Sequence, residues 1–227
     1  MLFHMAPTKV SRAGFVLAGG KSSRMGAGID KAFLDFGGQT LLDRALSVVG
    51  AVCDNVAIVG EPAKFEAVLN SRFSVLSKTQ RQSLGTENRE LRTVIADIFS
   101  GCGPLAGIHA ALANSPAELN LMLAVDMPFV SKELLAFLFA AAEDEVNHSV
   151  VTVPRAGNGL QPLCAVYRRE FSITAEQALR AGKYKIDAAF PGVAVRVIDE
   201  AELAAAGFSE RSFFNVNTPQ DRLKAEG

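Results

Sequence analysis

The sequence predicts an α/β protein, a single doubly wound (Rossmann-like) domain with a mostly parallel sheet. Apolar runs of strand length, rich in β-branched residues, alternate along the chain with segments of helical periodicity. Most of these runs are continuous and do not alternate apolar with polar residues, which is typical of strands covered on both faces. With 227 residues, 49% of them hydrophobic, the chain can build a sizeable core.

The strand candidates are short apolar runs separated by turn-forming or helical sequence. They are Gly14–Ala18, Asn55–Val59, Thr93–Ala96, Asn120–Val125, Ser149–Val153, Leu163–Val166 and Val193–Ile198. The helix candidates are Leu41–Val52, Ala63–Leu69, Leu105–Ala113, Lys132–Ala142, Ala175–Ala181 and Glu200–Ala205. Because helices stand between most of the strands, we expect them to cover both faces of one sheet.

Several helix candidates carry start or stop signals. Thr40 and Ser131 stand where a helix N-cap hydroxyl is expected, and Pro104 suits a first helical turn. Gly182 and Gly207 suit helix ends, because glycine adopts the left-handed conformation there without strain.

The domain organisation is predicted to be simple. Residues 1–12 are expected to be a flexible lead-in, and residues 13–227 a single domain without an internal linker. The segment Ser77–Arg92 is polar and lacks apolar periodicity, so we expect an insertion around residues 77–92. Two interpretations stay open for it: a long exposed loop or mobile insertion, and a lid or a partner contact.

Composition excludes several function classes. The net charge is −1 and no basic stripe is present, so no nucleic-acid partner is expected. The longest uninterrupted apolar run, Leu134–Ala142, falls far short of the roughly 20 residues that cross a bilayer, so no membrane partner is expected. Cys53, Cys102 and Cys164 form no CxxC pair, which argues against a disulfide framework or a thiolate zinc site. Scattered thiols suit a reducing compartment, and we expect a cytoplasmic protein.

The stretch LAGGKSSRMG, Leu17–Gly26, follows the first strand candidate and raises the question of phosphate binding. A Walker A loop needs the pattern GxxxxGK[ST], which this stretch fails in both possible registers. Gly19 and Gly20 would still let a ligand approach the backbone without interference from a Cβ atom. Because ligands of open α/β sheets bind beyond the carboxyl ends of strands, we expect a phosphate site here. A tight, solvated turn is the alternative.

Charged residues of both signs accompany this loop. Arg24 can fork onto phosphate oxygens, and Lys21 and Lys31 can act as point charges. Asp126 ends a later strand candidate, where a carboxylate could hold Mg²⁺ beside phosphates. Asp97 ends another strand candidate in the same way. A helix-capping role for Asp126 and a surface turn at Asp97 stay open, as does a P-loop hydrolase with Asp126 as its magnesium ligand.

These motifs together resemble the molybdenum cofactor guanylyltransferases, within the larger nucleotidyltransferase fold, and the resemblance runs through most of the chain. The matching segments are LAGGKSSRMG with Asp30 and Lys31, Gly103–Gly107 (GPLAG), Asp126–Pro128 (DMP), Gln161–Tyr167 (QPLCAVY) and Phe214–Asp221 (FNVNTPQD). LAGG alone occurs in many nucleotidyltransferases, whereas its combination with GPLAG, DMP and NVNTP is highly specific.

The resemblance implies an enzyme that transfers GMP from GTP to a molybdopterin-type molybdenum cofactor, releasing pyrophosphate and forming the guanine dinucleotide cofactor. It implies that Mg²⁺ binds at Asp126 and that Asn215 and Asn217 lie on the acceptor side. The implied catalytic residues are Arg24, Lys31 and Asp126. The residues implied to bind GTP are Leu17, Ala18, Gly19, Gly20, Lys31, Asp97 and Asp126. Other cofactor-biosynthesis or acceptor proteins are further candidate partners.

The chain departs from the family pattern at two places. One extra residue precedes Asp30, and Gly60 stands where many members carry an asparagine that contacts the nucleotide. Two alternatives therefore stay open, a cytidylyl- or sugar-phosphate nucleotidyltransferase of the same fold and a non-catalytic nucleotide-binding module. Cytidylyltransferase relatives more often have LAAG, so the LAGG spelling favours guanine.

Overall fold

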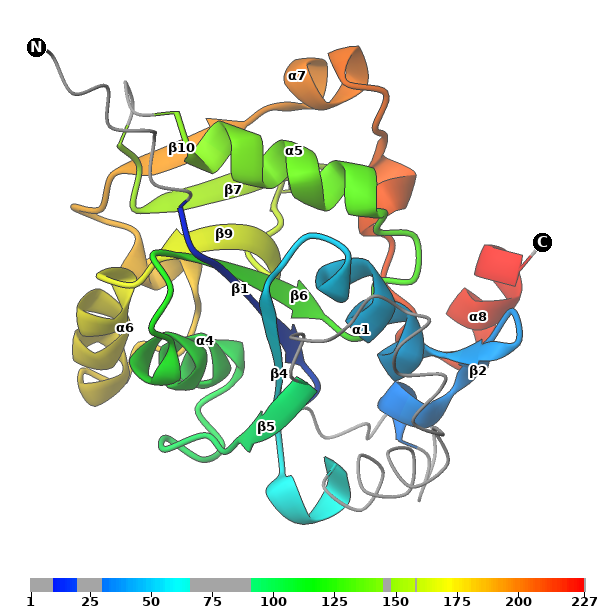
Figure 1. Ribbon diagram of the computed structural model, residues 1–227, viewed down its shortest axis with the longest axis horizontal. Coiled ribbons are helices and arrows are strands. Elements are labelled where there is room, and N and C mark those ends of the chain that lie inside the picture. Colours follow the sequence, from blue (N-terminus) through cyan, green and yellow to red (C-terminus); the bar gives the residue numbers. More distant parts are fainter. Residues whose placement is uncertain (1–9, 20–29, 66–90, 145–147, 158, 227) are drawn as a thin grey trace, which may run out of the picture.

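An eight-stranded sheet with helices on both faces forms the centre of the molecule (Figure 1). The computed structural model describes residues 10–19, 30–65, 91–144, 148–157 and 159–226. Its strands are β1 (Arg12–Leu17), β2 (Asp35–Phe36), β3 (Gln39–Thr40), β4 (Asn55–Val59), β5 (Leu91–Ile95), β6 (Leu119–Ala124), β7 (Val151–Ala156), β8 (Gly159–Leu160), β9 (Cys164–Arg168) and β10 (Val195–Ile198). Its α-helices are α1 (Leu41–Gly50), α4 (Pro104–Asn114), α5 (Lys132–Ala142), α6 (Phe171–Arg180), α7 (Glu200–Ala205) and α8 (Pro219–Glu226). Its 3₁₀ helices are η1 (Lys31–Phe33), η2 (Asp187–Ala189) and η3 (Glu210–Phe213).

The order of strands in the sheet is β10-β7-β9-β6-β1-β4-β5, and β8 pairs with β7. Strand β1 is parallel to both β4 and β6, β4 is parallel to β5, and β10 is parallel to β7. Only β9 runs antiparallel to its neighbours within this path, β6 and β7. The prediction of a doubly wound, mostly parallel sheet is therefore confirmed.

Successive side chains of the central strands point to opposite faces of the sheet, and helices cover both faces. In β1, Phe15 belongs to the core beneath α4 and α6, whereas Val16 belongs to the core beneath α1 and α5. In β6, Met122 belongs to the same core as Phe15, and Leu121 belongs to the same core as Val16. Continuous apolar runs were thus the correct signal for strands in the middle of the sheet.

The predicted helix signals are present in the structure. The Thr40 hydroxyl accepts a hydrogen bond from the Asp43 backbone at 3.1 Å, and the Ser131 hydroxyl accepts one from Leu134 at 3.2 Å. Gly182 and Gly207 have φ of 72° and 86° where α6 and α7 end. The sequence therefore located these helix boundaries through local chemistry.

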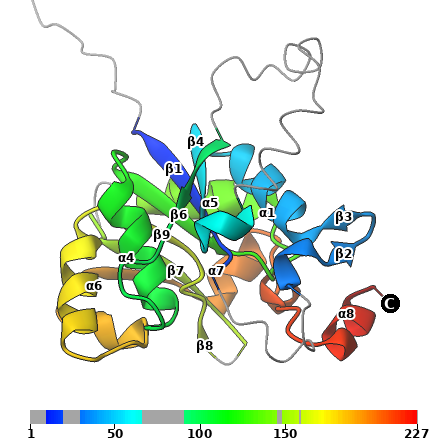
Figure 2. The same cartoon turned by 90° about the horizontal axis from the view of Figure 1, so that it is seen from below.

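Other elements differ from the predictions. Helix α6 begins at Phe171, earlier than predicted, and its N-cap residue Glu170 makes no side-chain cap bond that would have marked the start. Helix α8 and the β2–β3 hairpin were not predicted. They lie side by side (Figure 2), and Arg222 of α8 approaches Asp35 of β2 at 3.9 Å.

Some predictions concern residues outside the described ranges. They include positions 1–9 of the lead-in, residues 77–90 of the insertion and the second half of the Ala63–Leu69 helix. Within the described part of the chain, no helix is both long and apolar enough to span a membrane.

Candidate active site

A cavity lies at the carboxyl ends of the central parallel strands. After β1 the chain adds β4 and β5 on one side, and β6 then pairs with the other side of β1. This reversal of strand order is the point at which open α/β sheets bind ligands. The cavity measures about 150 Å³, less than the roughly 300–1,000 Å³ of pockets that enclose a whole ligand. A ligand larger than this would fill it with only one of its parts.

The cavity collects the predicted nucleotide residues that the structure describes. Its lining includes Leu17, Ala18, Gly19, Lys31, Asp97 and Asp126. They come from the end of β1, from η1, and from the turns after β5 and β6. Gly20, Lys21 and Arg24, also predicted to contact phosphate, lie outside the described residues.

The end of β1 is held by its two neighbours. The Ala18 N–H donates to the Val59 carbonyl at 2.9 Å, and the Val125 N–H donates to the Leu17 carbonyl at 3.1 Å. A Cβ added at Gly19 would lie 3.6 Å from the Gly60 Cα and 3.9 Å from an Asp97 oxygen, which are ordinary contacts. The fold therefore tolerates a side chain at Gly19, and a methyl there would occupy space that a ligand could use.

Gly60 differs from Gly19 in this respect. A Cβ at Gly60 would lie 2.7 Å from a ring carbon of Phe65, which is fully buried. The Phe65 ring thus fills the space beside the end of β4, where many relatives were expected to carry an asparagine. No side chain longer than glycine fits at this position without a shift of the ring.

Asp126 follows β6 and contacts the η1 lysine. Its carboxylate lies 3.4 Å from the Lys31 ammonium, and each side chain is 19% exposed. Burial raises the pKa of Asp126 above its ordinary value, and the nearby Lys31 charge only partly opposes this effect. The backbone is fixed as well, since the Val216 N–H donates to the Asp126 carbonyl at 2.9 Å.

Asp97 follows β5 on the other side of β1. Burial raises its pKa, and its Oδ1 atom is buried and accepts no hydrogen bond from any described residue. A Cβ at Gly107 of α4 would lie 3.6 Å from this oxygen, so α4 packs closely against the carboxylate. A buried acceptor without a partner is costly, and an N–H or O–H group of a ligand is the type of donor that would satisfy it.

Contacts at the backbone before Lys31 and at its ammonium group orient this residue. The preceding Asp30 caps η1 by accepting the Ala32 N–H at 3.0 Å, and Asp30 also pairs with Lys64. The Lys31 ammonium donates to the Asn217 side-chain oxygen at 2.5 Å. Sequence reasoning missed Lys64, because nothing in a single sequence indicates which distant charge will face Asp30.

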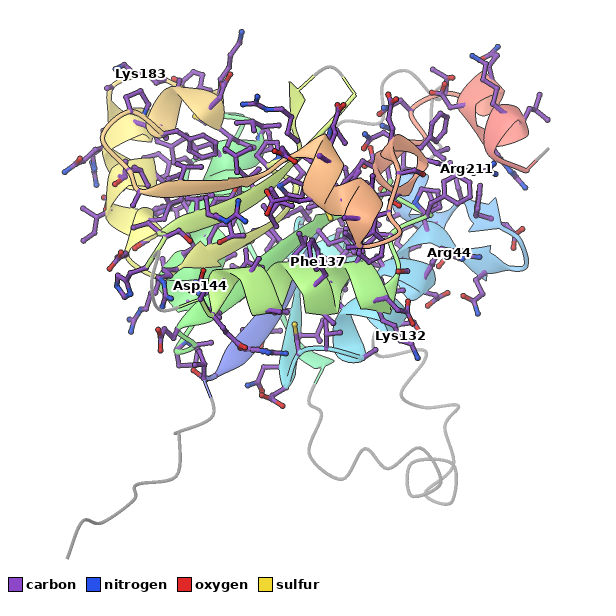
Figure 3. The ribbon with its side chains drawn as sticks, turned by 90° about the horizontal axis from the view of Figure 1, so that it is seen from above. Arg44, Lys132, Phe137, Asp144, Lys183 and Arg211 are labelled. Carbon is purple, nitrogen blue, oxygen red and sulfur yellow. The ribbon has the colours of Figure 1, made fainter. Side chains whose placement is uncertain are left out.

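The two asparagines predicted for the acceptor side do not share one environment. Asn217 contacts Lys31, whereas Asn215 lines a second cavity of about 520 Å³ and donates to the Phe213 carbonyl at 3.1 Å. This second cavity combines aromatic, amide and charged side chains, namely Phe129, Gln161, Glu210, Arg211, Phe214, Asn215 and Lys224. The Arg211 guanidinium lies 4.8 Å from the centre of the Phe129 ring. Figure 3 shows Arg211 on the side of the molecule that carries α8.

The carboxylates suit a cation that takes most of its ligands from phosphate and water. Among the described residues, no cluster of three or more His, Cys, Asp or Glu side chains could form a complete protein cage for a metal. Asp126 and Asp97 line the same cavity, burial raises the pKa of both carboxyl groups, and the Asp97 Oδ1 atom has no hydrogen-bond partner in the described structure. One or two carboxylates beside substrate phosphates is the usual protein environment of Mg²⁺.

The fold and this cavity define a nucleotide-binding α/β protein with an anionic and a cationic group side by side. Comparison with known proteins identifies the family: residues 14–191 match the MobA-like NTP transferase domain, and the chain belongs to that family. The "Probable molybdenum cofactor guanylyltransferase" of Pelotomaculum thermopropionicum is 37% identical over 93% of this chain and 90% of the relative. The "Molybdenum cofactor guanylyltransferase" of Desulfosudis oleivorans is 35% identical over 94% of this chain and 93% of the relative.

A solved structure agrees with these sequence relatives. The chain resembles molybdopterin-guanine dinucleotide biosynthesis protein A from Archaeoglobus fulgidus with a TM-score of 0.72 and 27% identity, covering 95% of this chain and 96% of that one. The predicted resemblance to the molybdenum cofactor guanylyltransferases is therefore confirmed. The predicted roles of individual residues stay predictions.

Proposed function

We propose that the protein transfers GMP from GTP to a molybdopterin-type molybdenum cofactor and releases pyrophosphate. The observation that carries the proposal is the meeting of Gly19, Lys31 and Asp126 in one cavity at the switch point of the sheet. In this arrangement the β1 loop receives the triphosphate and Lys31 neutralises part of its charge. Asp97 accepts a hydrogen bond from the nucleoside, because its buried oxygen otherwise has no partner in the described structure.

Asp126, which lines this cavity beside Lys31, would hold Mg²⁺. The ion would supply positive charge beside the phosphates, where negative charge accumulates as pyrophosphate leaves. Burial raises the pKa of Asp126, and a cation favours the ionised carboxylate that can bind it.

The acceptor is proposed to bind in the second cavity, on the side of Asn215. At about 520 Å³ this cavity falls within the size range of ligand pockets. Phe214 offers an aromatic side chain to a flat heterocycle, and Arg211, which lies over the Phe129 ring, and Lys224 offer charge to a phosphate. The terminal phosphate of such an acceptor is already anionic near neutral pH, so the attack needs no general base.

The segment 215–217 links the two cavities. Asn215 lines the second cavity, the Val216 backbone donates to Asp126, and Asn217 contacts Lys31. An acceptor in the second cavity would therefore approach the phosphates from the side of this segment. All three cysteines are free, which agrees with a reaction in the reducing cytoplasm. Other cofactor-biosynthesis proteins and the enzymes that receive the product are proposed as partners, because the proposed reaction takes its acceptor from the former and supplies its product to the latter.

Pyrophosphate release with a panel of nucleotides tests the proposal. The enzyme is incubated with Mg²⁺, molybdopterin-type cofactor and GTP, CTP, ATP or UTP in turn. Pyrophosphate should appear with GTP and only when the acceptor is present. Release with CTP would identify a cytidylyltransferase, and release of inorganic phosphate would identify a hydrolase. Binding of GTP with no product of either kind would identify a nucleotide-binding module without catalysis.

A further inference from the structure

The lysine proposed to meet the triphosphate is held by the C-terminal part of the chain. The Lys31 ammonium donates to the Asn217 side-chain oxygen at 2.5 Å, across a sequence separation of 186 residues. The Asp126 carboxylate also accepts from this ammonium, at a longer distance of 3.4 Å. A lysine side chain has four rotatable bonds, so a short bond to an immobile acceptor removes much of its conformational freedom.

Asn217 is itself fixed by the start of α8. The Asp221 carboxylate accepts the backbone N–H groups of Asn217 at 3.1 Å and of Thr218 at 2.9 Å. The Asp221 N–H in turn donates to the Thr218 hydroxyl at 3.1 Å. The hydrogen bond of this carboxylate with Thr218 lowers the pKa of Asp221, and those from the backbone act in the same direction. Asp221 therefore remains an acceptor at neutral pH and holds the Asn217 backbone in place.

The residue before Asn217 provides a second anchor. Val216 is fully buried, and its N–H donates to the Asp126 carbonyl at 2.9 Å. The backbone on either side of the Asn217 side chain is thus attached both to Asp126 and to the α8 cap. The side-chain oxygen that accepts from Lys31 therefore extends from an anchored stretch of backbone.

From these contacts we propose that Asn217 is a positioning residue for Lys31, and that Asp221 acts through Asn217. The proposal rests on the proposed function, and it gives Asn217 a task other than contact with the acceptor. An ammonium held beside the phosphate site before the nucleotide arrives loses less freedom on binding, so affinity for GTP rises. The NVNTPQD motif then serves the GTP site through its second asparagine and its aspartate, and the acceptor cavity through its first asparagine.

A double-mutant cycle on nucleotide affinity tests this proposal. Asn217→Leu keeps the size of the side chain and removes its oxygen. We expect it to weaken the binding of a fluorescent GTP analogue roughly 3- to 10-fold, the cost of ordering one long side chain. Lys31→Met should weaken binding as well. Asn217→Leu should then have little further effect in the Lys31→Met background, because Asn217 acts through that lysine.

Asp221→Ala provides an independent variant, since it leaves the Asn217 side chain intact and removes the carboxylate that accepts the backbone N–H groups of Asn217 and Thr218. We expect the same direction of change, with a smaller size. The matched control is Asp199→Ala. Asp199 caps α7 by accepting the Glu202 N–H at 2.9 Å, and α7 contributes no residue to either cavity. Loss of this cap should lower thermal stability and leave GTP affinity unchanged.

Two results would overturn the proposal. Unchanged GTP affinity in Asn217→Leu with a raised KM for the acceptor would assign Asn217 to the acceptor alone. Additive losses in Asn217→Leu and Lys31→Met would show that the asparagine does not act through the lysine. Failure of the proposed function looks different, because the wild-type protein would then bind GTP without forming pyrophosphate, or would not bind it.

Discussion

Replacing Asp126 by asparagine should abolish most of the activity without weakening the fold. The carboxylate lies 3.4 Å from the Lys31 ammonium, and at an effective dielectric constant near 20 that separation corresponds to about 5 kcal/mol of attraction. The pKa of Asp126 is nevertheless raised, with burial as the larger cause. The cost of removing the charge from water therefore exceeds what Lys31 returns, and asparagine avoids that cost.

The sign of the pH effect follows from the raised pKa. The folded protein holds the Asp126 proton more tightly than the unfolded chain does. The free energy of unfolding therefore falls as pH rises above the ordinary pKa of aspartic acid and Asp126 ionises. Asp126→Asn should therefore melt at or above the wild-type temperature at pH 7, with the difference shrinking near pH 4. Glu202→Gln should behave in the opposite way, since pairing with Arg196 lowers the pKa of Glu202. Its destabilisation should be present at pH 7 and fade as pH falls.

The activity of Asp126→Asn should fall about 10²- to 10³-fold in kcat, the usual loss for one preorganised charge contact, or about 3–4 kcal/mol. Mg²⁺-dependent pyrophosphate release gives kcat, and thermal unfolding at pH 7 and pH 4 gives stability. A variant with more than a tenth of wild-type turnover would remove Asp126 from the chemistry. A melting temperature well below wild type at pH 7 would refute the inference that its charge is a burden to the fold.

Three further outcomes are expected. Gly19→Ala should fold normally and raise the KM for GTP about tenfold. Gly60→Ala should lose roughly 1–3 kcal/mol of stability in denaturant melts, because its new methyl group meets Phe65. Equal stability of the two variants would contradict this difference between the two glycines. Arg211→Met should raise the KM for the acceptor several-fold and leave the KM for GTP unchanged, because Arg211 lines only the second cavity; a change in the GTP value alone would argue against that assignment. Removal of divalent metal with a chelator should stop pyrophosphate release while circular dichroism stays unchanged, and activity that survives the chelator would exclude a metal role.

The sequence predicted the parts of the site that depend on local pattern. Gly19 and Asp126 follow apolar runs, and strands that run parallel bring their carboxyl ends to one edge of the sheet. The caps at Thr40 and Ser131 are local as well. An apolar run predicts a strand but not whether the strand runs parallel or antiparallel to its neighbours. The antiparallel orientation of β9 could therefore not be predicted.

Contacts between distant segments lay beyond this reasoning. The bond from Lys31 to Asn217 joins opposite ends of the chain, and the ion pair of Asp30 with Lys64 joins η1 to the residues after β4. Helix α8 escaped prediction because its sequence is polar and shows no apolar face that would mark it as a helix packed on a core. Its role becomes visible only once Asp221 is seen at its first turn.

The direction of the pKa shifts separates the acids of the site from those of the scaffold. Among described carboxyl groups with a resolved shift, Asp97 and Asp126 alone have a raised pKa, and both line the cavity at the switch point of the sheet. Acids that cap or pair on the surface, such as Glu202 and Asp221, have a lowered pKa because the folded state supplies them with donors. Asp126 already has Lys31 as a partner, which only partly offsets the effect of burial, whereas the Asp97 Oδ1 atom has no hydrogen-bond partner in the described structure. Raised pKa values at two carboxyl groups of one cavity are typical of a functional site, which agrees with the roles proposed for them.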